Sequence, residues 1–280
     1  MPQQIDANFF EHPRLMAVLN VTPDSFYDGG QLYTPGSATA ALDLVLARVE
    51  AQLAAGADII DIGGESTRPG AAEVSSQQEI DRVLPLVEAL HARFDVPLSI
   101  DTSNAQLMTE AAAAGAALIN DVRALSREGA LQAAAETGLH VCLMHMQGQP
   151  ATMQQRPVYS NVVDELQQWF KERMAICEAA GINRDKLILD PGIGFGKSDE
   201  HNLALLRATA DFVALGCPVL IGVSRKSMLG RLLGRPPEQR LAGSLALAYD
   251  VLMRGAKVLR VHDVEETADL IRLFNLLHRA

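Results

Sequence analysis

The sequence predicts an α/β protein, a (β/α)₈ barrel that occupies a single domain over residues 1–280. Eight short apolar segments recur along the chain, amphipathic helical patterns lie between them, and glycine repeatedly ends a helical pattern shortly before the next apolar segment. Barrels of this class are typically ~250 residues long. A doubly wound open sheet is the competing layout. The count of eight, and the lack of a dinucleotide-binding fingerprint after the first segment, favour the barrel.

The apolar segments are rich in β-branched residues and most of them end in a polar residue. Continuous apolar runs of this length are typical of strands buried on both faces of a parallel sheet. In chain order the predicted strands are 15–20, 58–63, 97–102, 117–121, 140–145, 187–191, 218–225 and 258–263.

Helical spacing of apolar residues fills the intervals between these strands. Ser76 and Glu79 are spaced as a capping box at the start of the second helix. The recurring glycines at the predicted helix ends are Gly56, Gly115, Gly138, Gly181, Gly216 and Gly255.

Composition excludes several classes of protein. The formal net charge of −10 argues against a broad surface for nucleic acid or anionic membrane. No segment approaches the ~18 apolar residues that a membrane span needs, and the N-terminus lacks the features of a signal peptide. The three cysteines lie far apart without metal-ligand spacing, so we expect small core residues in a reduced, cytoplasmic protein.

Polar residues mark the ends of the predicted strands, where barrel enzymes carry their active sites. They are Asn20, Asp61, Asp101, Asn120, Asp121, His145, Asp190, Ser224, Arg225, Arg260 and His262. Some, such as Asp121, could simply cap the next helix. Capping does not require Arg260 and His262, which point to the same face of one strand. With Arg225 and Lys226 on the neighbouring strand, they predict an anion site, because loops after strands 7 and 8 of barrels frequently bind phosphate.

The glycine-rich stretch DPGIGFGK, residues 190–197, is not a nucleotide-binding loop. The spacing before Gly196 is one residue short of a Walker A loop, and the glycines follow GxGxG rather than GxGxxG. Two interpretations remain: the glycines let the chain turn after strand 6, or they let the backbone approach a flat ligand beside Asp190 and Phe195. Two further loops, 20–30 and 63–72, are long enough to cover a pocket.

Seven segments in register resemble the dihydropteroate synthases, a family of folate-pathway enzymes. They are LNVTPDSFYDGG, DIGGESTRPGA, SIDTS, INDV, DPGIGFGK, GVSRKS and RVHD, between residues 19 and 263. The resemblance implies that the amine of 4-aminobenzoate displaces diphosphate from (7,8-dihydropterin-6-yl)methyl diphosphate. Tyr27 and Ile193 are small departures that change no charged position.

The resemblance also implies roles for individual residues. The pterin would be bound by Asp101, Asn120, Asp190 and Lys226, and the diphosphate by Asn20, Arg68, Arg260 and His262. The 4-aminobenzoate would be bound by Thr67, Pro69, Phe195 and Ser227. Asp101, Lys226 and Arg260 would carry catalysis, with Asn20 contacting Mg²⁺, and a carboxylate near the methylene suggests a dissociative step. Sulfonamides should compete with 4-aminobenzoate, and a homodimer is expected.

Three residues keep open roles at this stage. His145 lies at the rim but is flanked by methionines, so we favour a structural histidine over a substrate contact. Met144 could form the floor of the pterin pocket, and Asp61 could act through water or by orienting the loop at 63–72.

Three rival functions make different demands on the sequence. A methyltetrahydrofolate:corrinoid methyltransferase barrel would share the pterin-binding acid and amide but has no need of SRK and RVH. A pterin-binding scaffold without activity should have lost some of Asn20, Asp101, Lys226 and Arg260, and none is missing. A phosphosugar aldolase would need a Schiff-base lysine on an inner strand, which the sequence does not show.

Overall fold

The computed structural model describes residues 5–21, 38–65, 74–148, 153 and 157–278. The described strands are β1 (Arg14–Asn20), β2 (Ile59–Gly63), β3 (Leu98–Asp101), β4 (Leu118–Asp121), β5 (His140–Met144), β6 (Leu187–Asp190), β7 (Leu220–Ile221) and β8 (Val258–Val261). All pair in parallel, in the order β6-β5-β4-β3-β2-β1-β8-β7. A parallel bridge between Leu189 and Val219 joins β6 to β7. The predicted (β/α)₈ barrel is therefore confirmed.

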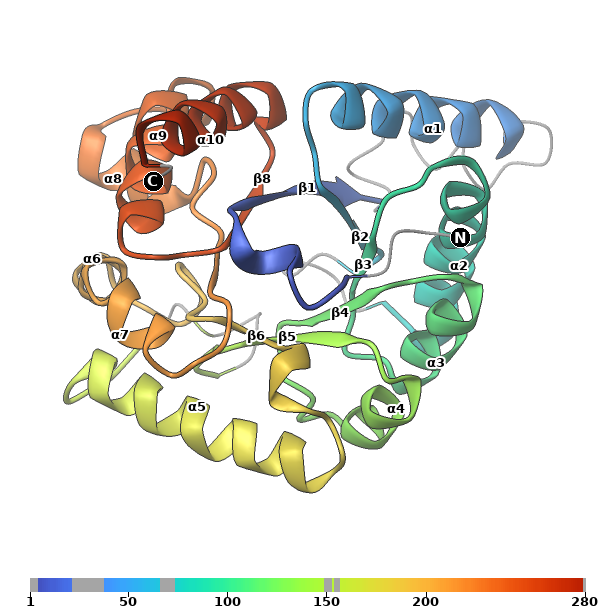
Figure 1. Cartoon of the computed structure of the whole chain (residues 1–280), viewed down its shortest axis with the longest axis horizontal. Helices are drawn as coiled ribbons and strands as arrows, with labels where there is room; N and C mark the ends of the chain where they lie inside the picture. Colours follow the sequence, from blue (N-terminus) through green and yellow to red (C-terminus); the bar gives the residue numbers. More distant parts are fainter. Residues whose placement is uncertain (1–4, 22–37, 66–73, 149–152, 154–156, 279–280) are drawn as a thin grey trace.

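Helices surround this ring of strands (Figure 1). They are α1 (Ala38–Ala54), α2 (Ser76–Arg93), α3 (Ala105–Ala114), α4 (Ala130–Thr137), α5 (Val162–Ala179), α6 (Asp199–Arg207), α7 (Thr209–Val213), α8 (Ser227–Leu233), α9 (Leu241–Met253) and α10 (Val264–His278). Short 3₁₀ turns lie at Phe9–Glu11, Arg184–Lys186 and Pro237–Gln239. Within the described residues, no helix combines the length and the apolar character that crossing a bilayer demands.

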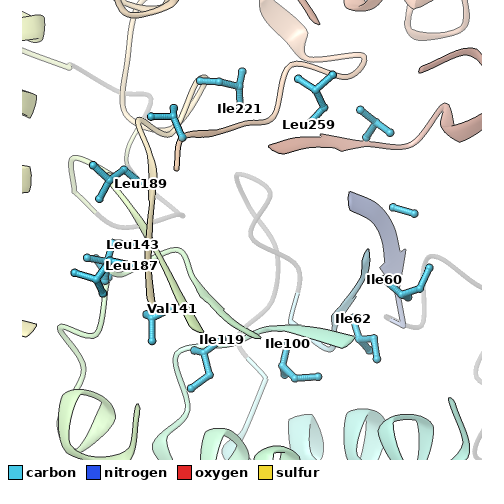
Figure 2. Close-up of a cluster of buried hydrophobic side chains, with 14 of the residues drawn as sticks. Ile60, Ile62, Ile100, Ile119, Val141, Leu143, Leu187, Leu189, Ile221 and Leu259 are labelled. Carbon is cyan, nitrogen blue, oxygen red and sulfur yellow. The ribbon is translucent and has the colours of Figure 1, made fainter. Parts of the chain in front are cut away.

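Alternate residues of each strand face opposite sides of the barrel wall. One set packs outward beneath the helices, and Figure 2 shows its members around the ring, including Ile62, Ile100 and Leu189. The other set forms a separate apolar layer inside the barrel. It consists of Met16, Ile59, Leu118, Cys142, Ile188, Leu220 and Val258. The three cysteines are buried and unpaired, as expected for core residues.

The segment before β1 packs against the inner apolar layer at the end of the barrel where the strands begin. Ile5, Phe9 and Phe10 contact the layer, and the segment crosses the barrel opening in Figure 1. Arg14 at the start of β1 donates to the carbonyl of Phe9 at 2.6 Å and pairs with Asp58 at 3.2 Å. This end is filled by apolar side chains, so the polar chemistry is left to the opposite end.

Two local features differ from the sequence predictions. The capping box of α2 is made by Ser75 and Gln78, one residue earlier than predicted, because the Glu79 side chain is buried and accepts from Thr102 Oγ1 at 2.7 Å. Strand β7 covers only Leu220–Ile221, because the chain leaves the sheet beyond Ile221 and turns at Arg225, whose φ is +52°.

Candidate active site

The next inward-facing residues of the strands form a second, mostly polar inner layer above the apolar one. Each lies two positions after a member of that layer, so strand periodicity turns its side chain to the same face. This second layer consists of Asp61, Asn120, Met144, Asp190, Gly222 and Arg260. Strand register places Asp101 beside both Gly63 and Asn120, and Met144 beside Asp190. The predicted residues of the middle strands therefore share one barrel mouth.

Arg260 joins two carboxylates in this mouth. Its Nε donates to Asp61 Oδ2 at 2.7 Å, and its Nη2 donates to Asp101 Oδ2 at 2.8 Å. Burial opposes the charge of Arg260, but Asp61 and Asp101 hold the pKa of its guanidinium above the ordinary value. One cation thus serves two acids, and the trio keeps a net negative charge when both acids are ionised.

Asp61 accepts hydrogen bonds from three strands besides its own. Its side chain is fully buried and accepts from Ser99 Oγ at 2.6 Å and from Asn120 Nδ2 at 3.2 Å, in addition to Arg260. Because the Asn120 amide nitrogen is turned toward Asp61, its oxygen faces elsewhere in the mouth. The sequence left the role of Asp61 open, between a contact through water and the orientation of the loop at 63–72. Its place on the inward face of the second strand, two residues before Gly63, was the signal that could have identified Asp61 as a site residue.

Asp101 has a strongly perturbed acidity. Burial raises the pKa of its carboxyl to about 7; Arg260 opposes this shift and Asp61 adds to it. A carboxyl in this position changes its charge near neutral pH.

Asp190 and Lys226 form the second charged group of the mouth. Burial raises the pKa of Asp190, and Lys226 opposes this. Burial also lowers the pKa of Lys226 to about 8, against the attraction of Asp190. The Lys226 ammonium donates to the carbonyl of Ile193 and lies 4.8 Å from the centroid of the Phe195 ring. A Cβ on Gly222 would be 3.8 Å from both Lys226 Nζ and Arg260 Cβ, so the two charged groups adjoin.

The glycine-rich stretch folds back against the end of β5. A Cβ on Gly192 would lie 2.0 Å from the His145 carbonyl oxygen, and one on Gly196 would lie 2.4 Å from that of Gln147. Both glycines also have positive φ. Close backbone packing therefore requires these two glycines. Gly194 instead lies beside the Lys226 side chain, with its Cβ position 3.4 Å from Lys226 Cδ.

The remaining predicted residues differ in how well they are placed. Asn20 ends β1, and its Oδ1 lies near Gly63 and Asp101. His262 is exposed just beyond β8, with Nδ1 3.2 Å from Ser224 Oγ, and Ser227 is exposed at the start of α8. Thr67, Arg68 and Pro69 lie outside the described residues, as do most of the loops at 20–30 and 63–72.

Arg225 does not join the predicted anion site. Its guanidinium forms two-pronged hydrogen bonds with Asp263, at 2.6 Å from Nη2 and 2.9 Å from Nε. Its left-handed backbone turns its side chain away from that of Lys226, the next residue. Arg225 instead ties the loop after β7 to the start of α10.

His145 is buried among protein groups, which is consistent with the structural role that the sequence favours. Its ring packs edge-on against Trp169 at 4.8 Å between centroids, and its Nδ1 lies 3.0 Å from Lys197 Nζ. Burial and the neighbouring Lys197 lower the pKa of the imidazole to about 3, so it stays neutral. Sequence reasoning missed Lys197, which is among the most buried side chains.

Comparison with known proteins agrees with this geometry. Residues 16–262 match the family model described as pterin binding enzyme. The dihydropteroate synthase of Escherichia coli K12 is 53% identical over 94% of this chain and 90% of its own length. Two solved structures are similar over 97% of this chain. They are the Yersinia pestis dihydropteroate synthase with a sulfonamide drug (TM-score 0.90, 52% identity, 96% of that chain) and the Xanthomonas albilineans dihydropteroate synthase with 4-aminobenzoic acid (TM-score 0.88, 44% identity, 95% of that chain).

A parallel barrel with acids and cations around one mouth, matched over most of its length by this family model, defines a pterin-binding enzyme. Within that class, the chain belongs to the dihydropteroate synthase family, whose members are transferases of a pterinylmethyl group.

Proposed function

We propose that the residues of the barrel mouth divide the dihydropteroate synthase reaction between two charged groups. The observation that carries this division is the pairing of Arg260 with Asp61 and Asp101 directly beside Lys226 and Asp190. In the reaction, the C–O bond between the pterin methylene and diphosphate breaks, and the electron pair leaves on the diphosphate. The amine of 4-aminobenzoate forms the new C–N bond and loses a proton.

The pterin would be bound by Asp190, Asn120 and Lys226. A carboxylate such as Asp190 can accept two parallel N–H bonds from an amino-pyrimidinone edge. Asn120 would offer its amide oxygen, because Asp61 holds the amide nitrogen. Lys226 would donate to the ring oxygen and ring nitrogen.

Asp101 would stabilise the charge that develops on the methylene as diphosphate leaves. A fixed, ionised carboxylate acts most strongly where charge appears only in the transition state. The pairing of Asp101 with Arg260 supports this role, since the cation favours the ionised form. Diphosphate would be bound by Asn20, Arg260 and His262, and by Arg68, which lies outside the described residues.

Mg²⁺ fits the donors near Asn20. A Cβ on Gly63 would lie 3.6 Å from Asn20 Oδ1 and 3.7 Å from Asp101 Oδ2, so both oxygens face the same small space. The described residues include no group of three or more His, Cys, Asp or Glu side chains that could hold a metal. Mg²⁺ usually keeps several waters and substrate oxygens, so Asn20 would suffice as its protein ligand. The ion would neutralise charge on the diphosphate.

The 4-aminobenzoate would bind beside Phe195 and Ser227, together with Thr67 and Pro69. The Phe195 ring lies next to Lys226, and Ser227 follows Lys226 directly, so ring and carboxylate would have adjacent contacts. The complex of the Xanthomonas albilineans enzyme with 4-aminobenzoic acid and that of the Yersinia pestis enzyme with a sulfonamide drug support the binding of such ligands by this chain. Sulfonamides should compete for it.

The reaction is tested by incubating the purified chain with pterin diphosphate, 4-aminobenzoate and Mg²⁺. Dihydropteroate and diphosphate should form together, and Asp190→Asn should abolish both. Release of diphosphate without 4-aminobenzoate would support the dissociative step. If no dihydropteroate formed, the proposal would be wrong.

A homodimer is proposed from the apolar surface of the last three helices, which lie side by side in Figure 1. The exposed side chains are Leu232, Leu233, Tyr249, Met253, Leu273, Leu276 and Leu277. An exposed apolar patch of this kind marks a contact surface. Light scattering should give twice the monomer mass for the wild type and the monomer mass for Leu276→Glu/Leu277→Glu. A monomeric wild type would refute the dimer.

We further propose that the chain is one domain and acts in the cytoplasm, in keeping with its unpaired cysteines.

A further inference from the structure

Lys197 ends the glycine-rich stretch and is buried, and no carboxylate among the described residues lies in hydrogen-bond contact with it. Its side chain is only 1% exposed, yet lysine is almost never fully buried unless paired. Its Nζ contacts the carbonyl oxygen of Phe195 at 2.9 Å, the carbonyl oxygen of His145 at 3.2 Å and His145 Nδ1 at 3.0 Å. These three contacts match the three N–H groups of an ammonium.

The three contacts close a ring of backbone around the ammonium. The amide of His145 donates to the Asp190 carbonyl at 2.9 Å, so the end of β5 is tied to the end of β6. From Asp190 the chain runs through two glycines to Phe195, whose carbonyl accepts from Lys197, and a third glycine follows Phe195. A chain with three glycines in five residues has much conformational freedom to lose. Glycines have no side chains that could anchor this stretch, and the Lys197 ammonium provides an anchor through the Phe195 carbonyl.

Other contacts hold the rest of this stretch, and the Phe195 amide donates to the Gly192 carbonyl at 3.0 Å, so Lys197 holds the carbonyl side of Phe195. The amide of Gly192 donates to Asp190 Oδ1 at 2.7 Å, and that of Gly194 donates to Asn202 Oδ1 at 2.7 Å. The Gly196 carbonyl accepts from Tyr159 at 3.0 Å. The Phe195 ring faces the Lys226 ammonium in the barrel mouth.

We propose that Lys197 is a positioning residue, whose buried ammonium fixes the Phe195 backbone and so places the Phe195 ring for 4-aminobenzoate. This inference rests on the proposed assignment of Phe195 to that substrate. Lys197 itself would touch no substrate. Burying the charged form of Lys197 costs free energy. Burial lowers the pKa of the ammonium to about 7, although Asp190 opposes this shift. A residue kept buried at such a cost is expected where geometry, rather than stability, is needed.

The test compares steady-state kinetics of the wild type, Lys197→Met and Lys186→Met. Lys186 is the matched control, because its Nζ also donates to a backbone carbonyl, that of Gly138, but it precedes β6 at the opposite end of the barrel. Lys197→Met should raise KM for 4-aminobenzoate at least about tenfold, since a misplacement of ~1 Å can cost 10²-fold. KM for pterin diphosphate should change less than about threefold, because Asp190 is held by β6. Lys186→Met should leave both values unchanged.

Two parallel measurements locate the effect. Trp169 is the only tryptophan of the sequence and packs on His145, so its fluorescence should shift in Lys197→Met and not in Lys186→Met. Phe195→Leu should raise KM for 4-aminobenzoate as Lys197→Met does, and the double variant should be no worse than the poorer single variant, because both act on one ring.

Each failure has a separate meaning. If Phe195→Leu raises KM and Lys197→Met does not, the positioning role is wrong while the substrate assignment stands. If Lys197→Met raises KM and Phe195→Leu does not, Lys197 does not act through Phe195, and the inference is again overturned. If neither changes KM, the assignment of Phe195 fails as well. Should Lys197→Met not fold, His145→Leu, which removes an acceptor, should raise KM more than His145→Gln, which retains one; equal values would overturn the inference.

Discussion

The guanidinium of Arg260 reaches from β8 past β1 and β2 to Asp101 at the end of β3, with Nη2 2.8 Å from Oδ2. Arg260 also contacts Asp61, which accepts from Asn120. Arg260 therefore couples the predicted diphosphate side of the mouth to the predicted pterin side. Substrate diphosphate would therefore meet a cation that is already engaged with acids, and the charges of all three residues must be considered together.

Arg260→Ala should lower both activity and stability. Loss of an aligned charge from such a site costs about 10²-fold or more in turnover. Removal of one partner also leaves the fully buried Asp61 without its cation, which should lower the free energy of unfolding by about 3 kcal/mol or more. Steady-state rates and urea unfolding measure the two effects. Arg254→Ala, which breaks a surface pair with Asp250, should leave both turnover and stability close to the wild-type values, because exposed ion pairs contribute little. Near wild-type turnover in Arg260→Ala would contradict the assignment of the mouth.

The pH dependence of kcat/KM should be bell-shaped. Asp101 must be ionised to stabilise the methylene, and its pKa is raised to about 7, so activity should rise with pH through that value. Lys226 must be protonated to bind the pterin, and its pKa is lowered to about 8, so activity should fall as pH rises further. Because kcat/KM reports the groups of the free enzyme, these two values should define the limbs.

Lys226→Arg separates the two limbs, because arginine stays protonated throughout this range. The maximum should fall, since the two cations differ in shape, but the decline at high pH should disappear while the rise near neutral pH remains. An unchanged decline at high pH would show that another group causes it.

Two glycines with similar backbone angles should respond differently to alanine. Gly192 and Gly216 have φ of +65° and +87°. A Cβ added at Gly192 would lie 2.0 Å from the His145 carbonyl oxygen, whereas no described residue lies within 4 Å of the Cβ position of Gly216. Gly216→Ala should cost about 1–2 kcal/mol from the left-handed conformation alone. Gly192→Ala should lose several kcal/mol more, or fail to fold, as thermal unfolding would show. Equal losses would mean that the close approach is relieved cheaply.

Strand periodicity explains how much of this site could be predicted. The sequence identified Asp101, Asn120, Asp190 and Arg260 because parallel strands bring their ends to one rim. The sequence could not show that Arg225 and Lys226 have different roles. The directions of adjacent side chains at a strand end depend on the local backbone, and here Arg225 has a positive φ. Lys197 was missed for a related reason: its partners are backbone carbonyls and a histidine from another loop, and no sequence spacing encodes such contacts.

Asp61→Asn should reduce activity indirectly, through its effect on Arg260 and Asn120, which are proposed to bind substrate. The change keeps the shape of the side chain but removes the charge that pairs with Arg260 and replaces one of the two oxygens that accept from the Asn120 amide with a donor. We expect kcat/KM for pterin diphosphate to fall at least about tenfold, while KM for 4-aminobenzoate stays within about threefold. Asp58→Asn is the matched control, because Asp58 also pairs with an arginine and accepts from the Leu15 amide at 2.7 Å, but at the opposite end of the barrel. That variant should lose stability and keep its kinetic constants. If Asp61→Asn behaved in the same way, Asp61 would be only a structural residue of the barrel interior, and the orientation of Asn120 would have to come from the substrate.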